Sequence, residues 1–94
     1  MSEALVRRRL RIEGRVQGVG FRWFTRGAAE DLGLVGWVRN EADGSVLCEV
    51  QGSVDAVTAL QRAVEGGPRF ARVDRVSVQD VAIEAGAAGF VVTG

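Results

Sequence analysis

The spacing of the apolar residues changes across one glycine-rich segment, residues 14–20, and this change constrains the fold most strongly. Before the segment, residues 9–13 alternate between charged and apolar side chains, a pattern typical of a strand with one buried face. The segment itself holds three glycines in seven residues, which predicts a loop. After it, the apolar residues fall three or four positions apart, which predicts a helix. The predicted buried face of that helix consists of Phe21, Phe24, Ala28 and Leu32.

The rest of the chain repeats the same two patterns. Gly33 is suited to end the first helix, and Ser53 is suited to cap the start of a second one. The predicted apolar face of the second helix consists of Val54, Val57, Leu60 and Val64. In chain order, the predicted elements are a strand at 9–13, a helix from 21, strands at 35–40 and 45–51, a helix after 53, a strand at 73–81 and a short strand at 89–93.

This order predicts an α+β fold, the ferredoxin-like β-α-β-β-α-β arrangement, as one domain over residues 1–94. With 94 residues, 47% of them hydrophobic, the chain can bury one small core. We expect an antiparallel sheet with both helices on one face and the short fifth strand at an edge. In this arrangement the first and second strands run parallel, with the third strand between them.

Two segments of this fold should meet at one edge of the sheet. The glycine-rich loop follows the first strand, and Asn40 ends the second. Because parallel strands end at the same edge, the fold brings the loop and Asn40 together. The first helix also begins there, and its unpaired N–H groups and positive dipole end favour a negative charge. The sequence therefore predicts an anion-binding site at this edge.

The loop, residues 15–21, has the composition of an anion-binding turn. Gly18 and Gly20 can adopt positive φ, which allows successive backbone amides to point inward. Arg22 adds a planar guanidinium group that can bind a phosphate through two hydrogen bonds. The loop is neither a Walker A motif nor a dinucleotide motif, because no Gly-Lys-Ser/Thr follows it and Trp23 stands in place of a third glycine. From the spacing alone, a tight turn without a ligand is an equal alternative.

Two sequence blocks, residues 14–22 (GRVQGVGFR) and residues 33–40 (GLVGWVRN), resemble the two signature motifs of the acylphosphatase family. The resemblance covers nearly the whole chain, with DGSV at residues 43–46 and QG at residues 51–52 at the expected distances. It implies the fold that the periodicity predicts. It also implies an enzyme that hydrolyses acyl phosphates to a carboxylate and inorganic phosphate.

The resemblance assigns roles to individual residues. Arg22 is expected to bind the substrate phosphate, and Asn40 is expected to orient the attacking water. Thr25 is expected to support the site through a hydrogen bond to the loop or to Asn40. The amides expected to hold the phosphate oxygens are those of Arg15, Val16, Gln17, Gly18, Val19, Gly20 and Phe21.

The composition restricts the chemistry of this site. The chain has no His and no Tyr, which removes imidazole as a base, a nucleophile and a metal ligand. A carboxylate leaving group, whose conjugate acid has a pKa of roughly 4 to 5, departs without a general acid. Cys48 lies in the middle of a strand, on its apolar face, and is expected to be a buried structural thiol. We therefore expect direct attack by water, with neither a phosphoenzyme nor a cofactor.

Metal ions are not expected at the site either. The carboxylates are scattered along the sequence, and only Glu41 and Asp43 lie near the predicted edge. Both are expected to form the turn between the second and third strands and to be solvated.

A second hypothesis is a non-catalytic module of the same fold that binds an anionic effector or RNA. An RNA-binding sheet needs aromatic residues on its open face and basic residues around it. The twelve basic and twelve acidic residues balance, and Arg9 and Arg11 are expected to form a solvated surface. Trp37 is expected in the core, and for Trp23 a contact with substrate is the less favoured interpretation. The side chains considered for strands one and three are not aromatic: Leu10, Ile12, Val46, Cys48 and Val50.

A third hypothesis is a carbamoyl-phosphate-processing domain of a larger maturation enzyme. Because the chain starts at Met1 and ends after its last predicted strand, we expect a complete small protein instead. We expect a monomeric cytoplasmic protein whose partner is a small acyl phosphate, with inorganic phosphate or sulfate as a site ligand. Neither nucleic acid nor a membrane is expected as a partner.

Overall fold

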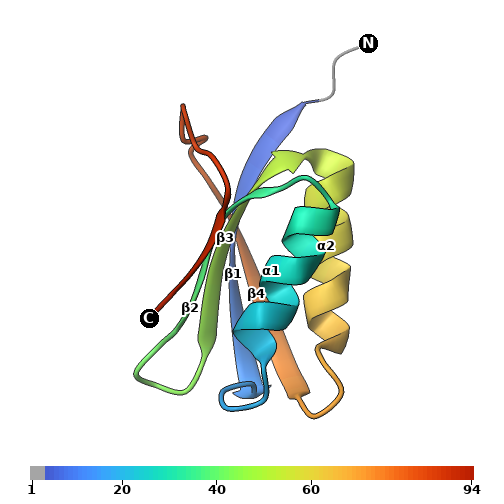
Figure 1. Ribbon diagram of the computed structural model, residues 1–94, viewed down its shortest axis with the longest axis vertical. Coiled ribbons are helices and arrows are strands. Elements are labelled where there is room, and N and C mark those ends of the chain that lie inside the picture. The colour runs from blue at the N-terminus through green and yellow to red at the C-terminus, as the bar shows by residue number, and fades with distance from the viewer. Residues whose placement is uncertain (1–3) are drawn as a thin grey trace.

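The computed structural model describes residues 4–94, which form a five-stranded sheet with two helices on one face (Figure 1). This arrangement is the predicted ferredoxin-like α+β fold with its fifth strand. The elements are β1 (Leu5–Arg15), α1 (Phe21–Asp31), β2 (Val35–Asn40), β3 (Val46–Ser53), α2 (Val54–Gly66), β4 (Arg72–Val81) and β5 (Phe90–Thr93).

The strands are ordered β4-β1-β3-β2-β5 across the sheet. β1 and β2 both pair antiparallel with β3, so they run parallel to each other, as predicted. β5 lies at the predicted edge, but it pairs parallel with β2, with Phe90 opposite Gly36. The expectation of a wholly antiparallel sheet is therefore wrong. The connection between β4 and β5 crosses to the opposite edge of the sheet, and β5 then enters in the direction of β2.

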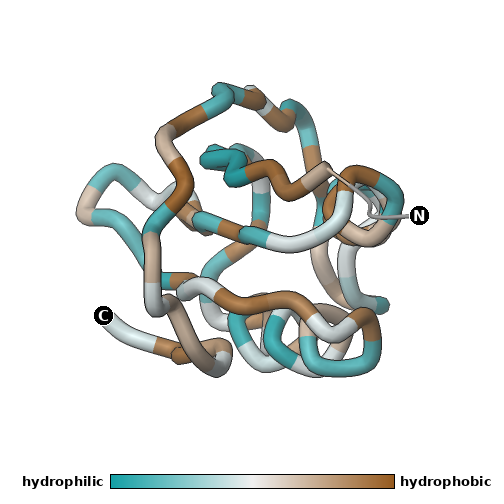
Figure 2. The backbone as a smooth tube through the Cα atoms, turned by 90° about the horizontal axis from the view of Figure 1, so that it is seen from above, coloured by the Kyte–Doolittle hydropathy of each residue, from teal (hydrophilic) through white to brown (hydrophobic). Residues whose placement is uncertain are grey.

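The face of the sheet that the helices cover holds the core. Leu10 and Ile12 of β1 are completely buried there, and residues 46, 48 and 50 of the central strand β3 lie beside them. Seen from above, the tube alternates between hydrophobic and hydrophilic segments along the strands (Figure 2). The RNA-binding hypothesis considered these apolar residues as the open face of strands one and three. That assignment is wrong, because the helices cover the apolar side of an amphipathic strand.

The buried face of α1 differs from the predicted one. Phe21 is buried as predicted, but the other buried positions are Thr25 and Ala29, whereas Leu32 is 36% exposed. These buried residues are four positions apart and form a narrow stripe. Burial of Thr25 is compatible with its polarity, because its hydroxyl donates to the carbonyl oxygen of Phe21 at 2.9 Å.

Both helix ends that the sequence marks are found in the structure. α1 ends before Gly33, which has the positive φ of 70° expected of a residue that stops a helix. At the start of α2, the Ser53 hydroxyl accepts a hydrogen bond from the Ala56 amide at 3.2 Å. Among residues 4–94, no helix is long and apolar enough to span a membrane.

Candidate active site

The loop between β1 and α1 presents unpaired amide groups. Gly18 and Gly20 have φ angles of 73° and 78°, so the backbone there takes the left-handed conformation that glycine adopts at low cost. Within the described part of the chain, none of the amides of residues 16–21 donates a hydrogen bond to a protein acceptor. Buried and half-buried amides normally have partners, so these donors are suited to an external acceptor such as an oxyanion.

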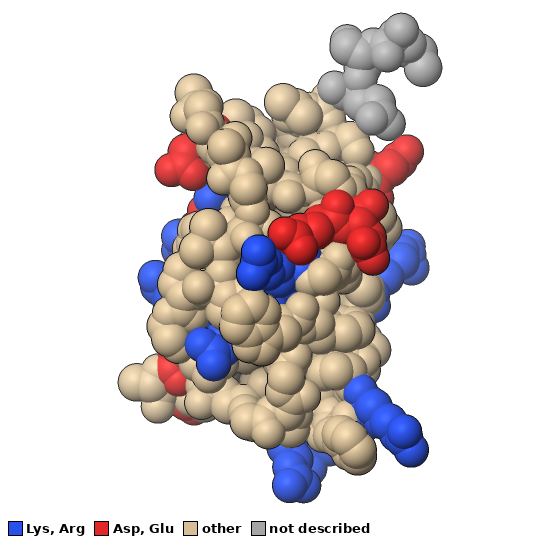
Figure 3. Space-filling model, in the orientation of Figure 1, with Lys and Arg blue, Asp and Glu red and all other residues tan. Residues whose placement is uncertain are grey.

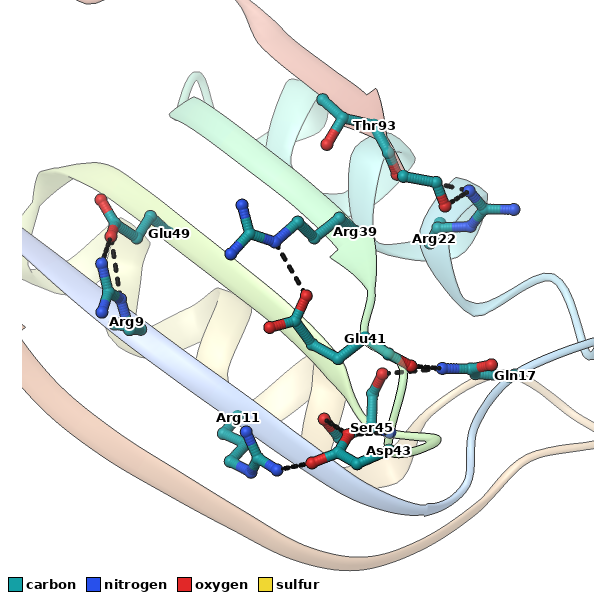
Figure 4. Close-up of polar contacts among 11 residues, drawn as sticks. Arg9, Arg11, Gln17, Arg22, Arg39, Glu41, Asp43, Ser45, Glu49 and Thr93 are labelled. Atoms are coloured by element: carbon teal, nitrogen blue, oxygen red, sulfur yellow. Dashed lines mark hydrogen bonds and ion pairs between the residues drawn. The ribbon is translucent and has the colours of Figure 1, made fainter.

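Arg22 stands in the first turn of α1, immediately after this loop. Its Nη1 atom donates to the main-chain oxygens of Thr93 at 3.3 Å and Gly94 at 2.9 Å, which places the guanidinium group against the end of β5 (Figure 4). Within residues 4–94, no hydrogen bond occupies its Nε or Nη2 atoms. A guanidinium group has five N–H donors, so Arg22 can be held by β5 and still bind a phosphate.

Asn40 ends β2 and is half-buried. Among the described residues, no side chain or backbone group forms a hydrogen bond with its carboxamide. The carboxamide offers one acceptor and two donors, which are the groups required to hold a water molecule.

These elements enclose one small pocket of ≈ 120 Å³. Arg22 and Asn40, from different elements of the sequence, meet in its wall, as the topology predicts. The predicted loop residues Arg15, Gln17 and Val19 do not line it. The lining residues are Val16, Gly18, Gly20, Phe21, Arg22, Trp23 and Asn40.

Gln17 differs from its neighbours in the loop because its side chain bonds another segment of the protein. Its side-chain Nε2 donates to the carbonyl oxygens of Glu41 at 2.7 Å and Ser45 at 2.9 Å (Figure 4). The loop is thereby tied to the β2–β3 hairpin, next to Asn40. A sequence pattern gives no signal for this contact, because it joins residues 24 and 28 positions apart.

Thr25 does not contact Asn40. Its hydroxyl donates to the carbonyl oxygen of Phe21, at the end of the loop and four residues earlier in the chain. Thr25 is completely buried, so it stabilises the junction of the loop and α1 from beneath. Of the two expected partners, the loop and Asn40, the hydroxyl therefore contacts the last residue of the loop, which is also the first residue of its own helix, and among the described residues it does not bond Asn40.

A larger hollow of ≈ 430 Å³ lies on the open face of the sheet, but its charges are already paired. Arg7 forms ion pairs with Glu49 at 2.7 Å and Glu84 at 3.4 Å. The guanidinium carbon of Arg39 lies 4.7 Å from the centre of the Trp37 ring, so Trp37 stands half-buried on this face and not in the core. The pairing leaves little attraction for an external anion.

The other arginines on the open face of the sheet are also paired. Arg9 hydrogen-bonds Glu49 at 2.9 Å, and Arg11 forms an ion pair with Asp43 (Figure 4). In the view of Figure 3, basic atoms stand at the lowest end of the molecule, where Figure 1 places the loop between β1 and α1, and acidic atoms lie at the lower left as well as in the upper half. The anion site is therefore better supported at the loop than on the open face.

The remaining reactive groups do not offer an alternative chemistry. Burial raises the pKa of the Cys48 thiol to about 12, and the nearby Glu49 carboxylate adds to this rise, so the thiol is protonated at neutral pH. Within residues 4–94, no three His, Cys, Asp or Glu side chains gather closely enough to hold a metal ion.

Proteins of known family share both the sequence and the fold of this chain. A sequence model of the acylphosphatase family matches residues 8–92. An acylphosphatase of Salinibacter ruber is 60% identical over 68 residues, which make up 72% of this chain and 72% of that protein. The crystal structure of acylphosphatase from Bacillus subtilis has a TM-score of 0.91 and 35% identity, covering 97% of this chain and 100% of that one.

A part of a much larger protein has the same fold. The crystal structure of full-length HypF in its phosphate- and nucleotide-bound form matches with a TM-score of 0.88 and 27% identity, covering 100% of this chain but 12% of that one. Motifs, fold and relatives agree, and this chain belongs to the acylphosphatase family, the enzymes that hydrolyse acyl phosphates.

Proposed function

We propose that the pocket of Arg22 and Asn40 is the catalytic site for acyl phosphate hydrolysis. The observation that carries this proposal is the meeting of three kinds of group in one pocket: the unpaired amides of the loop residues that line it, the Arg22 guanidinium, and the Asn40 carboxamide, which has no hydrogen-bond partner among residues 4–94. The amides and Arg22 bind the phosphate oxygens. Asn40 holds the water that attacks phosphorus.

The reaction needs little more than these groups. The water oxygen forms a bond to phosphorus while the bond between phosphorus and the acyl oxygen breaks. The carboxylate leaves with the electron pair, and the proton lost by the water passes to a phosphate oxygen or to solvent. Because phosphoryl transfer has a loose transition state, positioning and charge stabilisation lower the barrier without a strong base.

A phosphoenzyme is not part of the proposal. The chain has no His, and the Cys48 thiol is completely buried and protonated. Water is therefore the nucleophile that the site can supply.

Assays of the purified wild type, Arg22→Ala and Asn40→Ala on acetyl phosphate test the proposal. We expect Arg22→Ala to lose affinity for substrate and for inorganic phosphate, a competitive inhibitor. We expect Asn40→Ala to lower kcat about a hundredfold to a thousandfold with a smaller change in phosphate inhibition. Arg62→Ala, which removes an exposed arginine from α2, serves as the control. Equal turnover by the wild type and Arg22→Ala would overturn the proposal.

Two further properties belong to this proposal. We propose that the protein acts as a single domain, which is supported by curated relatives of similar length, such as one from Koribacter versatilis that matches over 100% of this chain and 86% of its own. We propose in addition that this domain is a monomer. Light scattering at micromolar concentration measures the mass. We also propose a cytoplasmic location, which the unpaired thiol of Cys48 supports.

A further inference from the structure

Trp23 is a large apolar side chain at the mouth of the candidate active site. It follows Arg22 in the chain, lines the same pocket and is 61% exposed. The other apolar side chains of the lining, Val16 and Phe21, are 1% and 2% exposed and belong to the core. Trp23 is therefore the apolar surface that the pocket presents to solvent.

The size of the pocket determines where an acyl group can lie. A volume of ≈ 120 Å³ is well below the roughly 300 Å³ at which sites that enclose organic ligands begin. The unpaired amides and Arg22 surround this small space, which is suited to the phosphate. The acyl part of a bound substrate must then extend beyond the pocket, along its rim.

The Trp23 ring is held in place from one side. The guanidinium carbon of Arg26 lies 5.7 Å from the centre of the ring, and Arg26 is itself bonded to Glu30 at 3.3 Å. An indole held in this way loses little conformational freedom when a ligand packs on its exposed surface.

We infer that Trp23 contacts the acyl group of the substrate and gives the enzyme a preference for aromatic and other large apolar acyl phosphates. This inference rests on the proposed function of the pocket and adds its substrate class. Trp23 contributes to binding through the acyl group alone, so a ligand without an acyl group does not use it.

Kinetics with two probe substrates test the inference. Benzoyl phosphate carries a ring that can pack on Trp23, and acetyl phosphate carries one methyl group. We expect Trp23→Ala to lower kcat/KM for benzoyl phosphate about five- to tenfold, and to change the value for acetyl phosphate less than about twofold. Trp23→Phe retains an aromatic face and should recover most of the benzoyl phosphate activity.

Two controls separate a substrate contact from a structural effect. Inhibition by inorganic phosphate should be unchanged in Trp23→Ala, because phosphate occupies the small pocket and has no acyl group. Leu5→Ala removes an equally exposed apolar side chain from the start of β1, distant from the loop, and should leave both substrates unaffected.

The possible outcomes are distinct. If Trp23→Ala lowers kcat/KM equally for both substrates, or for neither, the proposed role of Trp23 is overturned while the hydrolytic function stands. A wild-type protein that hydrolyses neither substrate overturns the proposed function, and the inference with it.

Discussion

The side-chain amide of Gln17 lies 2.7 Å from the carbonyl oxygen of Glu41, the residue that follows Asn40 (Figure 4). The same amide donates to Ser45 at 2.9 Å, across the β2–β3 hairpin. One side chain of the loop between β1 and α1 therefore fixes this loop relative to the residue proposed to hold the attacking water. We expect this contact to influence turnover without touching the substrate, because displacement of catalytic groups by about 1 Å can reduce a rate a hundredfold.

We expect Gln17→Ala to lower kcat about tenfold or more and to leave inhibition by inorganic phosphate within about threefold of wild type. The loop amides and Arg22 still bind phosphate in this variant, but Asn40 is no longer held in register with them. Steady-state kinetics with phosphate inhibition measure both quantities. Gln79→Ala, at an exposed position on β4, is the control. An unchanged kcat would contradict the positioning role of Gln17.

The buried ion pair between Arg7 and Glu49 leads to a prediction about stability. Burial alone would raise the pKa of Glu49, but hydrogen bonds and charges from Arg7 and Arg9 together lower it below 4.5. We expect Glu49→Gln to lower the free energy of unfolding at pH 7 by about 3 kcal/mol, because Arg7 is 4% exposed and loses its main partner.

The pH dependence of the stability lost in Glu49→Gln follows from the lowered pKa of Glu49. A carboxyl group whose pKa is lowered by folding stabilises the protein above its unfolded pKa, and that contribution is lost as the pH falls below about 4.5. The difference between wild type and Glu49→Gln in urea unfolding should therefore shrink between pH 7 and pH 3. A difference that is constant over this range would contradict the assignment.

Alkaline stability depends on Cys48. The chain contains no His and no Tyr, and all twelve of its basic side chains are arginines, so the thiol is the one side chain expected to titrate between about pH 8 and 12. Its pKa rises from 9.0 to about 12 on folding. Above pH 9 the unfolded chain releases this proton and the folded chain keeps it, so stability falls as the pH rises.

Urea unfolding at pH 8 to 11 measures how the free energy of unfolding changes with pH. Above pH 9 we expect it to fall by an amount that approaches about 1.4 kcal/mol per pH unit. Cys48→Ala should be less stable than wild type at pH 8 because of the cavity it leaves in the core, but its stability should change little between pH 8 and 11. A wild-type profile as flat as that of Cys48→Ala would count against a buried, protonated thiol.

Two glycines should respond to alanine in opposite ways. Gly27 lies within α1, and a Cβ atom added there meets no atom within 4 Å, so Gly27→Ala should stabilise the protein by about 0.5–1 kcal/mol. Gly36 has a φ of 147°, and an added Cβ would lie 1.9 Å from the carbonyl oxygen of Glu49. Gly36→Ala should therefore prevent stable folding.

Thermal unfolding measures both changes. For a domain of this size, the Gly27→Ala stabilisation corresponds to a rise in Tm of about 2–8 °C. A Gly36→Ala protein with the Tm of the wild type would show that β2 and β3 can separate at this point without cost.

Local patterns in the sequence determined the class of the fold and the place of the site. Alternation at residues 9–13 and the glycine-rich loop after it are properties of short segments, and so are the helix stop at Gly33 and the helix cap at Ser53. Combined with the order of the elements, they placed Arg22 and Asn40 at one edge of the sheet. The resemblance of two motifs to a family, and not the spacing of glycines, identified the reaction.

The tertiary structure decided what depends on contacts between distant segments. The parallel pairing of β5 with β2 follows from a long connection that carries no directional signal in its sequence. The position of Trp37 on the open face depends on which side of the sheet the helices cover, since a tryptophan is apolar enough for either side. The narrower stripe of α1, which buries Thr25 and exposes Leu32, depends on the shape of the surface it meets.

The same distinction applies within the site. The sequence indicated that Arg22, Asn40 and the loop would meet, because strand order and glycine conformation are encoded locally. It did not show that Gln17 binds the hairpin, or that Arg22 contacts the end of β5, because a hydrogen bond between distant residues exists only once the sheet has formed. Short-range patterns specify the elements, and the packing of those elements specifies which polar groups are paired and which stay free to bind substrate.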